Sequence, residues 1–351
     1  MGGMAMGSAW IARVGTRWRN LLRGYAVVEL VIGTLGLVFH WIFTHATAFG
    51  YDTLIPMLDS AQTVTIIKWG LASLLILPQT ILLGMTFPLM SGGLIRRFPG
   101  QDGDTLGGLY FTNSIGAAIG ALVSVFVLIP TVGLPGTTIT AGLLNFVVAA
   151  LAWRLGHDPE PLPAPTAAQG SGQDLRQKLL YGVLLATAIS GAASFVYEIT
   201  WIRMLSLAVG STQHAFELML ASFIAGIAFG GLWIRKRADR ASTPLRLAGW
   251  MQVAMGLAAL ASLVLYANSF EWVGWLVKAL PRTDGGYTLF NFGTAAVAIA
   301  IMLPAAFFAG TTLPLFTVAL LRAGFGERSI GRVYAWNTMG AIVGCSSPST
   351  S

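Results

Sequence analysis

Long apolar runs alternate with short polar loops along almost the whole chain. A helix needs about 20 apolar residues to cross the roughly 30 Å hydrocarbon layer of a bilayer. Runs of that length predict eight complete membrane spans, near residues 24–44, 65–95, 106–129, 133–153, 179–206, 214–234, 246–266 and 289–321. Two flanking apolar pieces, 2–12 and 330–345, are too short to cross. We therefore expect two partial spans, and a chain that is cut at each end.

The composition supports this interpretation. The 351 residues are 55% hydrophobic and 10% charged, whereas about a quarter of the residues of a soluble domain are charged. A soluble fold is therefore excluded, and the pattern predicts an all-α, polytopic bundle of transmembrane helices with the lipid bilayer as its partner. The net charge of +7 comes from Lys and Arg in short loops rather than from one aromatic-studded face, so we expect no nucleic-acid partner.

Neither metal nor cofactor chemistry has a signal in the sequence. One cysteine excludes an intramolecular disulfide, and the four histidines are scattered without the spacing of metal ligands. We therefore expect no metal site, no cofactor and no catalytic residue. The basic loops fall on alternate turns of the chain, and the positive-inside rule assigns that side to the cytoplasm.

A segment rich in Pro, Gly and Ala at residues 155–178 is too polar for lipid and has the composition of a linker. It divides the chain into a first transmembrane repeat, 1–154, which lacks its N-terminal part, and a second, 179–351, which lacks its C-terminal part. The linker is expected in the cytoplasm.

Three stretches recur in order, separated by 223, 226 and 224 residues. The pairs are GGMAMGSAWIAR (2–13) with AGIAFGGLWIRK (225–236), LPQTILLGMTFPL (77–89) with LPAAFFAGTTLPL (303–315), and LYFTNSIGAAIGA (109–121) with VYAWNTMGAIVGC (333–345). Each complete unit would hold six helices, an even number, so the two repeats run parallel. Parallel repeats of six are the arrangement of major facilitator folds.

Paired prolines mark one long span in each repeat. Pro78 and Pro88 lie ten residues apart, and Pro304 and Pro314 repeat the pattern. Each proline removes a backbone hydrogen bond, and interrupted helices at corresponding places in two repeats point to a binding site at the membrane midplane. The alternative is that these prolines only shape the bundle. The polar lining of such a site would be Gln79, Thr80, Thr86, Thr311 and Thr312.

Two further sets of polar residues are candidates for a substrate path. Asn113 and Asn337 lie one turn from small-xxx-small glycine pairs, where a buried amide either bonds across helices or meets a ligand. Glu198 and Glu217 are expected near the outer membrane boundary. Arg203, about 140° around the helix from Glu198, does not pair with it directly.

Three meanings of these carboxylates stay open. Anchoring at the headgroups, beside an aromatic belt of Tyr197 and Trp201, is one. A vestibule that attracts cations and a relay of protons or ions are the others.

The segments SGAASFVYEITWIRMLSLAVGS and FIAGIAFGGLWIRKRADR resemble the membrane region of bacterial spermidine synthase-like proteins, in which a major facilitator domain is fused to a synthase. The LPxxxxxGxxxPL and YxxNxxGAxxG segments fit the same family. RKRADR also resembles the inner-loop motif of major facilitator proteins, with Asp239 as its acid, whereas the first repeat has Thr16 there.

This resemblance implies a multi-pass protein of the bacterial inner membrane that transports or presents a polyamine or a related small organic cation. It also implies a soluble aminopropyltransferase domain as partner. The 351 residues hold no glycine-rich strand-to-helix turn outside the apolar runs, so no synthase activity is expected of them. Two alternatives stay open: a membrane anchor for that enzyme, or a stand-alone transporter.

Overall fold

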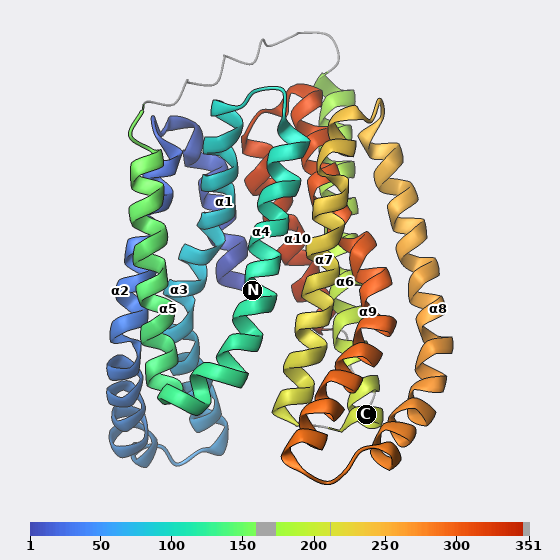
Figure 1. The fold of residues 1–351 in the computed structure, drawn as a ribbon. Coiled ribbons are helices and arrows are strands. Elements are labelled where there is room, and N and C mark those ends of the chain that lie inside the picture. Colours follow the sequence, from blue (N-terminus) through green and yellow to red (C-terminus); the bar gives the residue numbers. More distant parts are fainter. Residues whose placement is uncertain (159–172, 211, 347–351) are drawn as a thin grey trace.

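The computed structural model describes residues 1–158, 173–210 and 212–346, and the regular structure of these residues is helical throughout. Figure 1 shows two bundles of roughly parallel and antiparallel helices that lie side by side. We call them the N-terminal half and the C-terminal half. The sequence-based prediction of an all-α fold is confirmed for the described residues.

The N-terminal half contains five helices. They are α1 (Gly2–Val14), α2 (Leu21–Ala48), α3 (Ala61–Arg97), α4 (Asp102–Val123) and α5 (Ile129–Leu155). A π-helical turn, Ser124–Leu128, joins the last two. Asn20 caps α2 because its side-chain oxygen accepts the backbone N–H of Arg23.

The described residues of the C-terminal half also form five α-helices. They are α6 (Gln173–Val209), α7 (Gln213–Arg240), α8 (Pro244–Ala279), α9 (Asp284–Leu320) and α10 (Arg328–Ser346). Most of the expected linker, residues 159–172, lies outside the described residues, as do residues 347–351 at the C-terminal end.

Seven helical stretches of the described residues are long and apolar enough to cross a membrane, which indicates a multi-pass membrane protein. Eight were predicted from the sequence, and the difference lies in one stretch. Residues Asp102–Leu155 count as a single 54-residue candidate, yet α4 and α5 form two separate arms that run in opposite directions (Figure 1). Gly133, with φ of 69° and ψ of 179°, breaks the helical path near the start of the second arm. Only glycine adopts that conformation at low cost.

The prolines do not interrupt their helices. α3 runs continuously through Pro78 and Pro88, and α9 runs continuously through Pro304 and Pro314. Neighbouring threonine hydroxyls donate to main-chain carbonyl oxygens of the same helices, as from Thr80 to Leu77 at 3.0 Å. These are not the carbonyl oxygens that the prolines leave free, and packing against neighbouring helices is what supports an interrupted hydrogen-bond ladder in lipid here. The expected breaks are therefore absent from these two fully described helices.

Close glycine contacts join the helices that the recurring stretches pair. A Cβ atom added to Gly7 of α1 would overlap the carbonyl oxygen of Ile81 in α3. Its counterpart Gly230 of α7 would overlap the carbonyl oxygen of Phe307 in α9. Gly84 and Gly310 return the same contacts from the other side, against the backbones of α1 and α7. These glycines are needed because two helix backbones touch there.

Candidate functional site: a cavity between the halves

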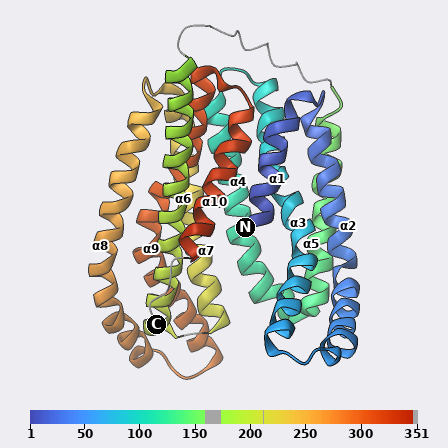
Figure 2. The same ribbon diagram turned by 180° about the vertical axis from the view of Figure 1, so that it is seen from behind.

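Two pairs of helices make most of the contact between the halves. α4 packs on α7, and α10 packs on α1, as Figures 1 and 2 show from opposite sides. Gly107 of α4 lies against the backbone of Gly231 and Arg235, while Gly331 of α10 lies against Ser8 and Ala12 of α1. The two contacts have the same form and hold the halves in close contact along these helices.

A cavity of about 370 Å³ lies between the halves. Six helices, α1, α4, α6, α7, α9 and α10, supply its walls. Its volume falls in the range of small-molecule sites. Four of the residues proposed from the sequence line it, namely Asn113, Glu198, Thr312 and Asn337.

Glu198 is the one formally charged side chain among the described residues that line this cavity. It lies on α6, and Ser194 of the same helix precedes it by one turn and also lines the wall. Phe195 and Phe223 contribute aromatic surface. A carboxylate next to aromatic rings is the combination that attracts an organic ammonium ion.

The surroundings of Glu198 differ from those of a headgroup belt. Trp201, one turn further along α6, is only 3% exposed, and its indole N–H donates to the hydroxyl of Ser262 at 2.9 Å. The expectation that Trp201 belongs to an interfacial belt is therefore wrong, because helix packing buries the ring. Arg203 is exposed, and no ion pair among the described residues joins it to Glu198.

Aromatic rings from both halves meet at one end of the cavity. Tyr110 of α4 and Tyr334 of α10 line it, and Phe87 of α3 packs against both rings, at centroid distances of 6.1 and 5.4 Å. Both tyrosines are nearer than Asn113 and Asn337 to the helix starts at Asp102 and Arg328. The aromatic layer therefore lies between the cavity and the end of the bundle where α1 ends and α10 begins. We call this end of the bundle the basic end.

Beyond this layer, Asp239 at the end of α7 holds the start of α4. Its two carboxylate oxygens accept the backbone N–H groups of Gly103 at 2.7 Å and Asp104 at 2.8 Å. Free N–H groups at a helix N-terminus are natural partners of a carboxylate. Asp104 in turn pairs with Arg235 at 2.5 Å, and Arg322 donates to the backbone carbonyl oxygen of Asp239 at 2.6 Å. The acid of the inner-loop motif thus ties one half to the other.

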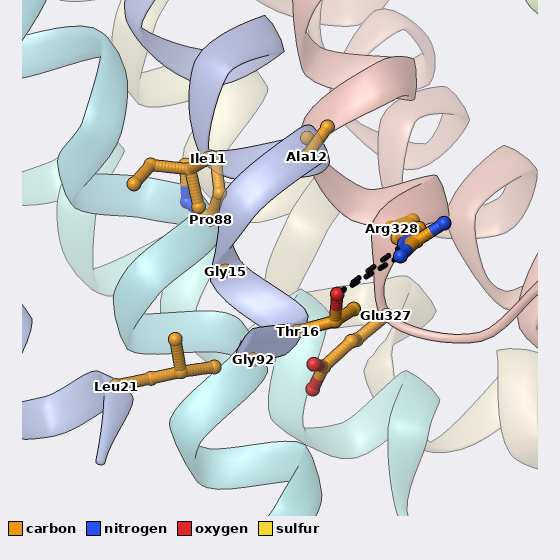
Figure 3. Close-up of a pocket in the computed structure, with 10 residues that line it drawn as sticks. Ile11, Ala12, Gly15, Thr16, Leu21, Pro88, Gly92, Glu327 and Arg328 are labelled. Carbon is orange, nitrogen blue, oxygen red and sulfur yellow. Dashed lines mark hydrogen bonds between the residues drawn. The ribbon is translucent and has the colours of Figure 1, made fainter. Parts of the chain in front are cut away.

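The start of α10 is held differently. Arg96 of α3 forms a bidentate ion pair with Glu327, with side chains 3% and 9% exposed, and donates to the carbonyl oxygen of Trp18 at 2.8 Å. Figure 3 shows Glu327 beside Thr16, and Thr16 accepting from Arg328 through its hydroxyl. Thr16 stands where the other half has Asp239, and the acid at this joint is Glu327, which pairs with the guanidinium of Arg96 rather than with backbone N–H groups.

The remaining proposed residues lie away from the cavity. Thr86 lines a separate cavity inside the N-terminal half, and Thr80 packs against Gly3 of α1. Thr311 is fully buried and donates to the carbonyl oxygen of Phe308 at 2.7 Å. Two others, Gln79 and Glu217, line neither the cavity between the halves nor the separate cavity of the N-terminal half.

Two further polar residues were not among the proposed site residues, although Glu29 is one of the few carboxylates within the predicted spans. Gln252 of α8 donates to the hydroxyl of Ser190, which lines the cavity, at 2.5 Å. Glu29 of α2 is 8% exposed and lines the separate cavity of the N-terminal half. Extending the first recurring stretch, with its 223-residue spacing, would have paired these two positions.

The described part of the chain has no cluster of three or more His, Cys, Asp or Glu side chains that could hold a metal ion. In comparisons with known proteins, no protein-family model matches this chain, and no curated protein matches it.

Proposed function

We propose that this chain is a membrane domain of the major facilitator type, with two parallel repeats, that binds a small organic cation in the cavity between its halves. The observation that carries the proposal is the isolated carboxylate of Glu198 in a cavity walled by both halves. A polyamine or a related ammonium compound has the matching charge and an apolar chain for Phe195 and Phe223.

Transport is the mechanism that this arrangement supports. The basic end holds the halves together through Asp239 and the ion pair of Arg96 with Glu327, and the aromatic layer lies between that joint and the cavity. Release of these contacts would open the cavity toward the basic end, as alternating access requires. In this proposal α4 and α5 each cross the membrane, which gives eight spans, and the basic end faces the cytoplasm of a bacterial inner membrane.

The resemblance to spermidine synthase-like fusions supports a second role. The chain would then deliver or receive the cation for an aminopropyltransferase domain, or anchor such a domain to the membrane. An anchor needs no charged group in a central cavity, so Glu198 favours binding over anchoring alone.

The test is equilibrium binding of radiolabelled spermidine to the purified chain in lipid nanodiscs. We expect Glu198→Gln to weaken binding at least tenfold, because a charge-assisted hydrogen bond contributes about 1.5–3 kcal/mol. Glu217→Gln is the matched control, since Glu217 does not line the cavity, and it should bind as the unmodified chain does. Equal binding by all three proteins, or no binding by any of them, would contradict the proposed cation site. The membrane anchor would then be the favoured role.

A further inference from the structure

A further cavity, of about 540 Å³, extends from the basic end into the N-terminal half. Its walls come from α1, α2, α3, α5 and the loop between α1 and α2. It shares no lining residue with the cavity between the halves or with the separate cavity of the N-terminal half. We call it the arginine–tryptophan groove, because its lining includes Arg19, Arg23, Trp10, Trp18 and Trp153.

Two positive charges lie at the polar end of this groove. The side chain of Arg19 is exposed. The Cζ atom of Arg23 lies 5.3 Å from the ring centroid of Trp153, and its Nε donates to the carbonyl oxygen of Gly156 at 3.0 Å, so neighbouring groups fix its position. No ion pair among the described residues joins Arg19 or Arg23 to a carboxylate. The polar end therefore carries positive charge that no described ion pair neutralises.

The opposite end of the groove is apolar. Val27 and Val31 of α2, both exposed, form one side of it, and Leu82 and Met85 of α3 form the other. Val31 lies about 12 Å beyond Arg23 along α2, because a helix rises 1.5 Å per residue. The groove therefore leads from charged groups at the basic end to an aliphatic surface deeper in the bundle.

Tryptophan side chains flank the polar end. Trp10 of α1 and Trp153 of α5 are 50% and 51% exposed, although each lines the groove. Tryptophan is enriched at the depth of the lipid headgroups, where its apolar ring and its N–H group both find suitable surroundings. The groove thus presents arginine and tryptophan first and aliphatic side chains after them, in the order of the headgroup and acyl chains of a phospholipid.

The C-terminal half covers its corresponding tryptophan with a side chain of its own. At the 223-residue spacing, Trp10 corresponds to Trp233 and Val14 to Arg237. The Cζ atom of Arg237 lies 4.2 Å from the ring centroid of Trp233, and the ring of Phe307 packs against the same indole at 5.7 Å. Because the N-terminal half has an aliphatic residue in place of that arginine, Trp10 stays open to a ligand.

We propose that the arginine–tryptophan groove binds an anionic phospholipid of the leaflet at the basic end. The phosphate lies between the guanidinium groups of Arg19 and Arg23, which form strong charge-assisted hydrogen bonds with phosphate oxygens. One acyl chain lies along Val27 and Val31. Basic pockets between transmembrane helices are suited to anionic headgroups. The inference needs only a multi-pass membrane protein, and it does not depend on a cation bound near Glu198.

Other occupants fit the groove less well. A small organic cation would be repelled by the two arginines. A zwitterionic phospholipid offers the same acyl chains, but its ammonium group weakens the electrostatic attraction to Arg19 and Arg23. A free phosphate would leave the exposed side chains of Val27 and Val31 without an apolar partner. An anionic phospholipid matches both ends of the groove.

The test is native mass spectrometry of the full chain, released from detergent micelles and titrated with dioleoyl phosphatidylglycerol. We expect saturable binding, and at least tenfold weaker binding of dioleoyl phosphatidylcholine, which has the same acyl chains and no net charge. Arg19→Gln should weaken phosphatidylglycerol binding about fivefold, and at least tenfold when Arg23→Gln is added. Arg240→Gln is the matched control, because this exposed arginine of α7 lies at the same end and does not line the groove. It should bind the lipid as the unmodified chain does.

A second pair of variants tests the apolar end. Val27→Trp fills the groove and should weaken phosphatidylglycerol binding at least fivefold. Val253→Trp is its control, because Val253 of α8 is also exposed and lies outside the groove. It should leave lipid binding unchanged. Circular dichroism verifies that each variant remains helical.

Glycerol phosphate, which has the headgroup charge without acyl chains, should not displace the lipid at millimolar concentration. Displacement would overturn the proposal, since the ligand would then be a free phosphate compound. Absence of saturable binding, equal binding of the two lipids, or equal losses from Arg19→Gln and Arg240→Gln would overturn it as well. Spermidine binding is measured separately, so failure of either proposal leaves the other standing.

Discussion

The two helices α4 and α10 carry the same glycine spacing but have different neighbours. Gly340 and Gly344 of α10 touch the backbone of α6, whereas Gly116 and Gly120 of α4 face open space among the described residues. A small-xxx-small pattern shows that a helix is able to dock closely. It does not show whether a partner is present. The same spacing therefore marks a filled helix contact on α10 and an exposed glycine face on α4 among the described residues.

The halves also differ at the basic end. The start of α10 is held by the buried pair of Arg96 and Glu327, and the start of α4 by Asp239 with the half-buried pair of Arg235 and Asp104. Four substitution pairs break or sharpen the comparison. Each is measured by unfolding in mixed micelles of mild detergent and sodium dodecyl sulfate, with circular dichroism as the signal.

The largest effect is expected for Arg96→Leu. It leaves Glu327 buried without its main partner, and breaking a buried ion pair costs about 3–5 kcal/mol of unfolding free energy. Arg235→Leu removes a half-exposed pair and should cost less than about 1 kcal/mol. Equal losses from the two variants would contradict the different burial of the two pairs.

Gly340→Leu comes next. The new side chain would collide with the backbone of α6, and overpacking of this kind costs about 1–3 kcal/mol or more. Gly116→Leu enters open space and should change the free energy of unfolding by less than about 0.5 kcal/mol. A loss of similar size from Gly116→Leu would show that another helix already covers this face of α4.

Asp239→Asn should have an intermediate effect. An amide offers one acceptor oxygen to the N-terminus of α4 instead of two and removes the favourable charge, which costs about 1–2 kcal/mol. Its sequence counterpart, Thr16→Ala, loses only exposed hydrogen bonds to Arg328 and should be nearly neutral. The reverse order would mean that Thr16 holds the joint.

The smallest measurable effect is expected for Gln252→Leu. It removes the bond to Ser190, and interhelical hydrogen bonds in membrane proteins contribute about 0.6 kcal/mol on average. Gly249→Leu on the same helix serves as a control and should be neutral. A gain in stability from Gln252→Leu would argue that the hydrogen bond between Gln252 and Ser190 does not hold α6 against α8.

Local pattern was enough to predict the helical fold. It also paired the stretches that hold Gly7 and Gly230, and each of these glycines lies against the backbone of a neighbouring helix. These features depend on apolar length and on glycines at helix contacts, which a sequence records directly. The path through Pro78 and Pro304 was not predictable in the same way, because packing against neighbouring helices supports a helix that proline alone would weaken.

The sequence also could not show how a side chain is oriented within the bundle. The distance along α6 predicted how far Glu198 lies from the start of the helix. It did not predict that Glu198 borders a cavity, because this depends on how α4, α7 and α10 pack around α6. Trp201 illustrates the same limit, because interfacial and buried tryptophans share one residue type. Glu29 differs from its counterpart Gln252, which donates a hydrogen bond to Ser190, and this difference is visible only in the structure.

The central claim is that Glu198 binds a small organic cation inside the cavity between the halves. Its most direct test is protection of a cysteine in the same wall, with Ser194→Cys introduced beside Cys345→Ser so that one thiol reacts with a methanethiosulfonate reagent. Saturating spermidine should slow this reaction at least fivefold, and the protection should disappear when Glu198→Gln is added. An unchanged reaction rate in spermidine, or protection that persists without the carboxylate, would contradict the account.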